Sequence, residues 1–123
     1  MTGQELLREA CALFFDSDTG YYEPYAAAQI NTLLADTFEV NNNLRRAQGK
    51  PVLGEILALG TLAQEIGYEE ALVRSAFGYG LASRLLFDDN DGGRQAVLEQ
   101  RYREAVARCD RGWVRLARGT GGR

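Results

Sequence analysis

One segment of the chain is apolar on almost every side of a helix: Ile66-Gly-Tyr-Glu-Glu-Ala-Leu-Val-Arg-Ser-Ala-Phe-Gly-Tyr-Gly-Leu-Ala-Ser-Arg-Leu-Leu-Phe-Asp-Asp-Asn-Asp-Gly92. Leu72, Ala76 and Tyr79 recur on one line at helical spacing, and Val73 and Phe77 on the next. A helix that is apolar this far round is normally surrounded by other helices. We therefore predict a central helix on which the rest of the chain packs.

Two glycines interrupt this helix at Gly78 and Gly80. Each costs about 1 kcal/mol relative to alanine inside a helix. Their presence predicts that another backbone, from the same chain or a neighbour, approaches closely here. They are not a phosphate-binding loop, because no strand precedes them and the third glycine of a dinucleotide fingerprint is absent.

The composition is that of an ordinary globular domain. The 123 residues are 46% hydrophobic and 25% charged, and no apolar run has the length of a membrane span. The charged N-terminal residues Glu5, Arg8 and Glu9 do not fit a secretory signal. Cys11 and Cys109 are far apart on apolar helix faces, which favours buried free thiols and a cytosolic origin over a disulfide.

The side chains needed for several kinds of catalytic site are missing. The chain has no histidine and only two cysteines, which excludes Ser-His and Cys-His nucleophiles, His-ligated metals and a Cys-only zinc site. Acidic pairs such as Glu69–Glu70 suit acid–base chemistry in principle, but adjacent residues on a helix diverge. We predict no enzyme activity, no catalytic residue, no metal and no cofactor.

Charge is distributed unevenly along the chain. Residues 1–93 hold 6 basic and 14 acidic side chains, whereas residues 94–123 hold 8 arginines and 3 acids. An acidic body with an arginine-only C-terminal segment suggests contact with an acidic partner.

Capping and turn signals outline the first half of the chain. Thr2-Gly-Gln-Glu5 is a capping box that starts a helix ending near Phe15. A loop of residues 16–25 follows and carries Tyr21, Tyr22 and Tyr25, which either form an interface or cover the helices. A longer second helix is predicted from Pro24 to the stop at Gly49 and Pro51.

Two features of the middle of the chain leave alternatives open. Residues 41–43 are three asparagines, which form either a solvated last turn or a polar contact that fixes the register of a partner. Residues 51–65 suit a short helix or an extended arm, and this segment is apolar enough to pack on the bundle or on a neighbouring copy. Its apolar residues include Leu53, Ile56, Leu57 and Leu59.

The last helix is predicted to begin after Asp91, with Leu98, Tyr102 and Ala105 on its buried stripe. Its flanks are either a solvated basic face or a surface that binds carboxylates or phosphate. They carry Arg101, Arg108, Arg111, Arg115 and Arg118. Residues 119–123 are a Gly-rich tail. The predicted fold is thus all-α: a small bundle of about four helices over residues 1–118, with an extended arm or loop and a C-terminal tail.

The chain resembles the helical head-to-tail adaptor (connector) proteins of tailed bacteriophages. The resemblance covers most of the chain and rests on the segments Tyr68-Glu-Glu70, Tyr79-Gly-Leu-Ala82, Leu85-Leu-Phe-Asp-Asp89 and Tyr102-Arg-Glu-Ala-Val106. In the second helix it rests on Ile30-Asn-Thr-Leu-Leu34 and Phe38-Glu-Val-Asn-Asn42. These are similarities of pattern, without a metal or nucleotide signature.

The resemblance implies a structural protein of the virion neck that assembles in the host cytoplasm. Copies would form a ring between the portal protein and the tail or next neck protein, and the genomic DNA would pass through the lumen without sequence-specific binding. Docking on the portal would fall to the C-terminal helix and tail: Arg108, Arg111, Trp113, Arg115, Arg118 and Arg123. Our candidates for the interface between copies are Tyr21, Tyr22, Tyr25, Leu53, Ile56, Leu57 and Leu59. No membrane partner is expected.

The alternative hypothesis is a small helical regulator that binds nucleic acid through its arginine-rich last helix. Against it, the chain has a net charge of −3, and that helix places its apolar stripe in the core. Domains that bind DNA are usually strongly basic.

Overall fold

The computed structural model describes residues 1–16, 18–86 and 92–121, with the backbone alone for residues 112–121. The elements are α1 (Gly3–Leu13), η1 (Thr19–Tyr21), α2 (Glu23–Asp36), α3 (Phe38–Ala47), α4 (Glu70–Leu72), η2 (Val73–Phe77), α5 (Gly78–Leu85) and α6 (Gly92–Gly121). α4, η2 and α5 follow one another without a break. The described residues therefore form five helices and a lone 3-10 turn without any strand, which confirms the predicted all-α fold.

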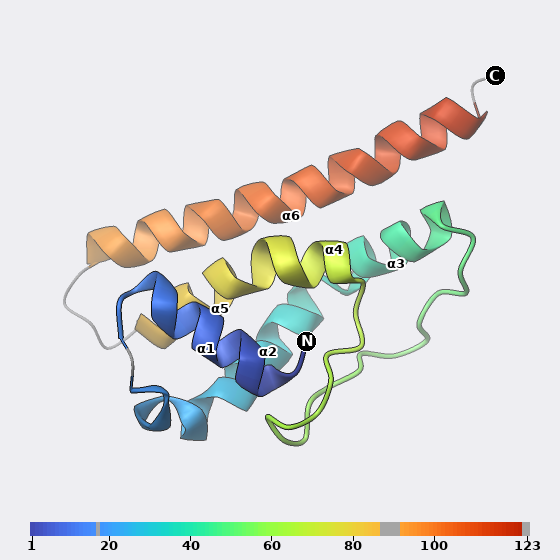
Figure 1. The fold of residues 1–123 in the computed structure, drawn as a ribbon. Helices are drawn as coiled ribbons and strands as arrows, with labels where there is room; N and C mark the ends of the chain where they lie inside the picture. Colours follow the sequence, from blue (N-terminus) through green and yellow to red (C-terminus); the bar gives the residue numbers. More distant parts are fainter. Residues whose placement is uncertain (17, 87–91, 122–123) are drawn as a thin grey trace.

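The central helix formed by α4, η2 and α5 lies between α6 and the pair α1 and α2 (Figure 1). Its residues Leu72, Ala76, Phe77 and Leu81 are fully buried. Thus the helix predicted to organise the fold does so, although it begins at Glu70 instead of Ile66 and contains a π-helical turn over Val73–Phe77. Residues 88–91, the predicted acidic cap, lie outside the described residues.

The glycines of the central helix are approached by side chains and not by another backbone. A Cβ added at Gly80 would lie 2.7 Å from both Leu33 Cδ2 and Tyr102 Cδ1, and one at Gly78 would lie 2.7 Å from Glu9 Oε1. The prediction of a close approach at these glycines is therefore correct, but the prediction that another backbone makes it is wrong. The missing Cβ at Gly80 leaves room for the side chains of Leu33 from α2 and Tyr102 from α6.

The predicted second helix is divided at Thr37 into α2 and α3. Thr37 is buried, and its hydroxyl donates to the Leu33 carbonyl at 2.8 Å. This side-chain bond competes with the regular helical pattern and bends the chain. The single long helix predicted from Pro24 was therefore wrong, whereas the stop is correct: α3 ends at Ala47 and Gly49 has φ +75°.

The two terminal helices begin where the sequence places them. The Thr2 side chain accepts from the Glu5 amide and the Glu5 carboxylate accepts from the Thr2 amide, so the capping box is formed. α6 starts at Gly92 and buries Leu98, Tyr102 and Ala105. Its helical assignment reaches Gly121, which is three residues into the predicted tail. A helix of this length spans about 45 Å. In Figure 1 its C-terminal half extends beyond α1, α2 and α5.

Candidate functional site

The arm, residues 48–69, runs without regular secondary structure along α2 and α3 (Figure 1). Asparagine side chains hold it at two points. The Asn42 amide group accepts from the Leu53 N–H at 2.8 Å and donates to the Leu53 carbonyl at 3.1 Å. Asn31 does the same for Leu59, at 2.7 and 3.1 Å. An asparagine amide offers one acceptor and a donor group, so it pairs both backbone groups of a residue as a neighbouring strand would.

Charged and polar contacts fix the two ends of the arm. The Glu69 N–H donates to Asn41 Oδ1 at 2.7 Å. The nearly buried Glu69 carboxylate forms ion pairs with Lys50 at 2.9 Å and Arg45 at 3.6 Å. The alternative of a short helix over residues 51–65 is therefore wrong. The interpretation of residues 41–43 as a solvated turn is also wrong, because Asn41 and Asn42 are buried against the arm of their own chain.

The arm presents an apolar and acidic outer surface, which we call the arm face: Val52, Glu55, Ile56 and Leu57. Among the residues predicted to join copies, Ile56 and Leu57 are exposed, whereas Leu53 is half-buried. Leu59 is only 5% exposed and belongs to the core. Leu59 is therefore unavailable as an interface residue, because the Asn31 bonds turn it inward.

At the other end of the molecule, Phe15 projects into solvent just after α1. Its side chain is 91% exposed, and its φ of +61° is in the left-handed region that L side chains rarely adopt. It borders a groove of about 400 Å³. We call it the Phe15 groove. It is lined by Leu13, Phe15, Tyr79, Arg94, Val97, Leu98 and Arg101. Sequence reasoning missed this site, although two adjacent phenylalanines at a helix end signal that only one of them can face the core.

The tyrosine loop divides between the two predicted roles. Tyr22 packs edge-on against Phe14, with ring centroids 5.3 Å apart, and its hydroxyl donates to Asp16 at 3.0 Å. Burial, with the neighbouring Asp16, raises the pKa of Tyr22 to about 12. Tyr22 thus covers the helices, whereas Tyr21 and Tyr25 are exposed and remain available to a partner.

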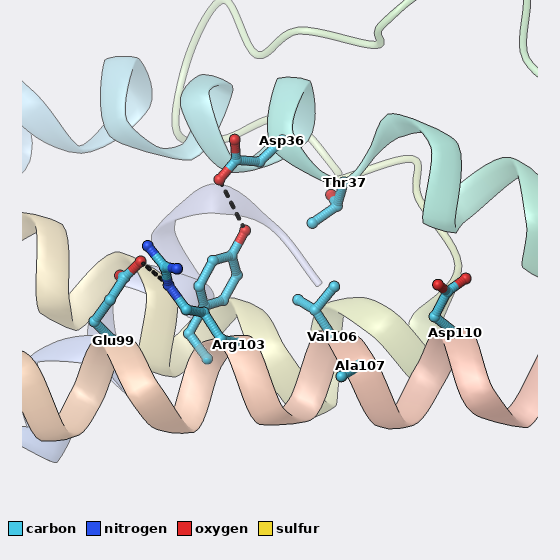
Figure 2. A pocket seen from close by; sticks show the side chains of 8 residues that line it. Asp36, Thr37, Glu99, Arg103, Val106, Ala107 and Asp110 are labelled. Atoms are coloured by element: carbon cyan, nitrogen blue, oxygen red, sulfur yellow. Dashed lines mark hydrogen bonds and ion pairs between the residues drawn. The ribbon is translucent and has the colours of Figure 1, made fainter.

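A second groove separates α2 and α3 from α6, and Figure 2 shows its lining residues. They are Asp36, Thr37, Glu99, Tyr102, Arg103, Val106, Ala107 and Asp110. Burial is the main cause that raises the pKa of Tyr102 well above its usual value, and Asp36 also contributes.

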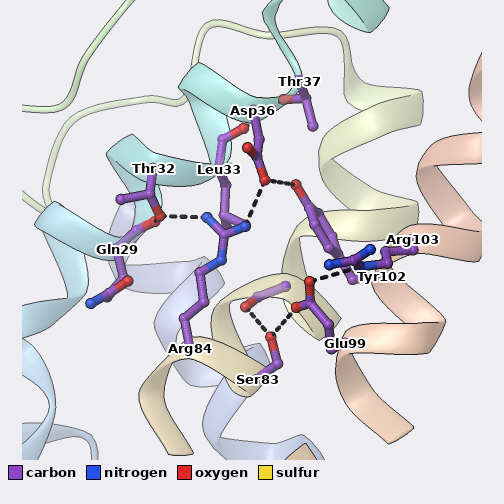
Figure 3. Close-up of polar contacts among 11 residues, drawn as sticks. Gln29, Thr32, Leu33, Asp36, Thr37, Ser83, Arg84, Glu99, Tyr102 and Arg103 are labelled. Carbon is purple, nitrogen blue, oxygen red and sulfur yellow. Dashed lines mark hydrogen bonds and ion pairs between the residues drawn. The ribbon is translucent and has the colours of Figure 1, made fainter. Parts of the chain in front are cut away.

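The polar groups around this groove pair with one another across three helices (Figure 3). Arg84 of α5 forms an ion pair with Asp36 of α2 at 2.7 Å, and the Tyr102 hydroxyl of α6 donates to the same Asp36 oxygen at 3.5 Å. Glu99 of α6 accepts from the Ser83 hydroxyl at 2.9 Å, and its other oxygen accepts from Arg103 at 3.1 Å. This network therefore holds α2, α5 and α6 together.

The C-terminal half of α6 carries the predicted portal-side residues. Arg108 and Arg111 are exposed. The side chains of Trp113, Arg115 and Arg118, and all of Arg123, lie outside the described residues. Arg101 lies earlier on α6 and was not among the predicted portal-side residues; its guanidinium lies 6.0 Å from the centre of the Tyr79 ring in the Phe15 groove.

The prediction of two buried free thiols is confirmed for Cys11, whereas Cys109 is free but not fully buried. Cys11 is buried, and burial with the nearby Asp16 and Asp18 raises its pKa to about 11. Cys109 is half-buried, with its Sγ 3.4 Å from the Ser75 hydroxyl. In the part of the chain that the structure covers, no group of three or more histidine, cysteine or acidic side chains is arranged to hold a metal ion.

None of the helices in the described ranges has the length and apolarity needed to cross a membrane. Comparison of the chain with protein-family models, with curated proteins and with solved structures finds no match.

Proposed function

We propose that this protein is a non-enzymatic assembly protein that joins two larger structures, and specifically a head-to-tail adaptor in the neck of a tailed-phage virion. Copies would form a ring between the portal and the tail or next neck protein. Assembly would take place in the host cytoplasm, and the genomic DNA would pass through the lumen without sequence-specific contacts or any membrane.

The observation that carries this proposal is a pair of exposed apolar surfaces of different shape at opposite ends of a well-packed body. The Phe15 groove lies where α1 ends and α6 begins, and the arm face lies below α3 (Figure 1). Exposed apolar surfaces of this kind mark sites of protein contact. A chain with two different contact surfaces can join neighbours in series, which a ring requires.

The C-terminal half of α6 supports docking on a separate partner. Exposed Arg108 and Arg111 precede Trp113, Arg115 and Arg118 in the sequence, while the rest of the chain is acidic. Arginine pairs with carboxylates through two parallel hydrogen bonds, and tryptophan and arginine are enriched at the centres of interfaces. This arrangement suits an acidic surface on the portal.

The nucleic-acid hypothesis has less support. Asp110 stands between Arg108 and Arg111, and Arg103 is paired with Glu99. A DNA-binding helix would present its arginines without acids between them, and its affinity would fall steeply with salt.

The experiment is a pull-down of tagged protein from cells that carry the source phage or prophage, read by mass spectrometry. Wild-type protein should recover portal, head and tail proteins. A chain lacking residues 113–123, and an Arg108→Ala/Arg111→Ala variant, should lose the portal but keep the helical circular dichroism spectrum.

The matched control replaces two exposed arginines of other helices, Arg8→Ala/Arg74→Ala, and should still recover the portal. Recovery of nucleic acid without virion proteins would refute the adaptor proposal. Portal recovery by the truncated chain would instead show that docking lies outside the C-terminal segment.

A further inference from the structure

We infer that the Phe15 groove of one copy receives the arm face of the next copy, with Arg101 pairing to Glu55 across the contact. This inference deepens the proposed function, because it rests on self-assembly and names the two surfaces that would meet. It concerns contacts between copies and leaves the choice of the portal-side surface unchanged.

The two surfaces are both partly apolar. The groove offers half-buried Leu13 and Tyr79, exposed Val97 and the projecting ring of Phe15. Its volume of about 400 Å³ lies in the range of pockets that enclose a small ligand. The arm face is an extended segment held at Leu53 and Leu59 by asparagines, so Ile56 and Leu57 project between two fixed points.

The fixed arm reduces the cost of association. A segment that is already ordered in the free protein loses little conformational freedom when it enters a groove. The same holds for Phe15, whose position follows directly from the end of α1. Burial of its ring, which is 91% exposed, would remove a large apolar area from water.

The charges of the two surfaces are complementary. Residues 51–73 contain four acids and no basic residue. Glu65, Glu69 and Glu70 of this segment form ion pairs within the chain. Glu55 is exposed, and no described residue forms an ion pair with it. The Phe15 groove carries Arg101, whose guanidinium lies over the Tyr79 ring. A guanidinium that lies over a ring can still donate hydrogen bonds to a carboxylate through the N–H groups at its edge.

The positions of the surfaces determine the kind of assembly. The groove is lined by the end of α1 and the first turns of α6, whereas the arm runs below α3 on the far side of α1 and α2, so one copy cannot fill its own groove (Figure 1). Each copy would use its groove toward one neighbour and its arm toward the other. Such a heterologous contact produces a closed ring where the rotation closes, and an open series of copies where it does not.

Disulfide trapping tests the contact directly. All variants carry Cys109→Ser, so that the buried Cys11 is the remaining native thiol. After mild oxidation, a chain with both Phe15→Cys and Ile56→Cys should form a ladder of covalent oligomers. Phe15→Cys mixed with Ile56→Cys should stop at the heterodimer, because each chain contributes a single engineered thiol. Both positions are exposed, so neither change should unfold the protein.

A matched control pairs Ile56→Cys with Ala35→Cys, an exposed position on α2 that does not line the groove, and should give no dimer above background. In sedimentation, Arg101→Glu should weaken association about 3- to 10-fold, and adding Glu55→Arg should restore it. Because the trap itself removes two apolar side chains of the contact, the sedimentation result decides: an Arg101→Glu chain that associates as tightly as wild type, or Phe15→Cys chains that mainly pair with each other, would overturn the inference.

These outcomes separate the inference from the proposed function. A ladder without portal recovery would retain the arm-to-groove contact and refute the adaptor. If the protein recovers the portal and forms rings, but the cysteines at positions 15 and 56 do not cross-link and the Arg101→Glu chain associates as tightly as wild type, the adaptor proposal stands and this contact is refuted.

Discussion

Replacing the two asparagines that hold Leu53 and Leu59 of the arm should loosen it, Asn31→Ala more than Asn42→Ala, whereas Asn43→Ala should change it little. Asn31 and Asn42 each make two hydrogen bonds to one arm residue. Asn43 instead donates to Asp110 of α6 at 3.4 Å and accepts from Arg46 of α3 at 2.8 Å. It therefore serves as a matched control of the same residue type.

The expected loss in the free energy of unfolding depends on how deeply the arm residue that loses its asparagine partner is buried. A hydrogen bond contributes about 0.5–1.5 kcal/mol net, and a buried group left without a partner costs about 1–3 kcal/mol. Leu59 is 5% exposed, so water cannot easily replace Asn31 there, whereas half-buried Leu53 can be hydrated.

The alanine itself stabilises a helix by roughly 0.6 kcal/mol relative to asparagine. The net loss in the free energy of unfolding is then about 1.5–2.5 kcal/mol for Asn31→Ala and about 0.5–1.5 for Asn42→Ala. Asn43→Ala should be within about 0.5 kcal/mol of neutral, because its bond to Asp110 is long at 3.4 Å and its bond to Arg46 lies at the surface.

Urea denaturation followed by circular dichroism measures these differences, and hydrogen exchange locates them. The Leu59 amide should lose protection in Asn31→Ala, and the Leu53 amide in Asn42→Ala, while the helical amides of α5 keep theirs. If Asn31→Ala were no more destabilising than Asn43→Ala, or if Leu59 exchange were unchanged, the arm would not be held by these side chains.

Three further predictions concern the core, the strained turn and pH. Gly80→Ala should destabilise by about 1–2 kcal/mol despite the better helix former, because its Cβ would lie 2.7 Å from two buried side-chain atoms. Gly78→Ala is its control, because the Cβ there would meet the flexible Glu9 carboxylate, which can move aside. Thermal melts compare the two variants. Phe15→Asn should raise the free energy of unfolding by about 0.5–1 kcal/mol, because asparagine tolerates positive φ better; urea denaturation measures it. Burial raises the pKa of Tyr68 from 10 to about 12, so stability present below pH 10 should be lost as the pH rises toward 12. Tyr68→Phe should make that fall shallower in denaturation curves taken between those pH values.

Each of these has a clear contrary result. Equal melting temperatures for the two glycine variants would mean that α2 and α6 adjust freely around α5. A Phe15→Asn protein less stable than wild type would mean that the exposed ring makes a stabilising contact. If the Tyr68→Phe variant has the same pH profile as wild type, the pKa of the Tyr68 hydroxyl is not raised by folding.

Local signals predicted the helices whose ends depend on neighbours in sequence. The capping box at Thr2 and the glycine stop at Gly49 are each formed by groups within a few residues of one another. The break at Thr37 was missed because a threonine inside a helical pattern is ambiguous. It bends the chain here because its hydroxyl is buried and bonds to Leu33.

Contacts between distant segments were not predictable from spacing. Asn31 and Leu59 are 28 residues apart, as are Asn41 and Glu69. The sequence shows polar residues in a helix, but it does not show which backbone groups they meet. The same limit applies to Phe14 and Phe15: either ring could face the core, and only the turn after α1 decides that Phe14 does.

The sequence by itself determined an all-α chain with a central apolar helix, an acidic body and an arginine-rich last helix, because these depend on periodicity, capping and charge along the chain. The tertiary structure decided where that helix is crowded, how the arm is held and which apolar residues stay outside. Those depend on side chains that meet across long separations, where a single buried hydrogen bond or an absent Cβ determines the path of the backbone.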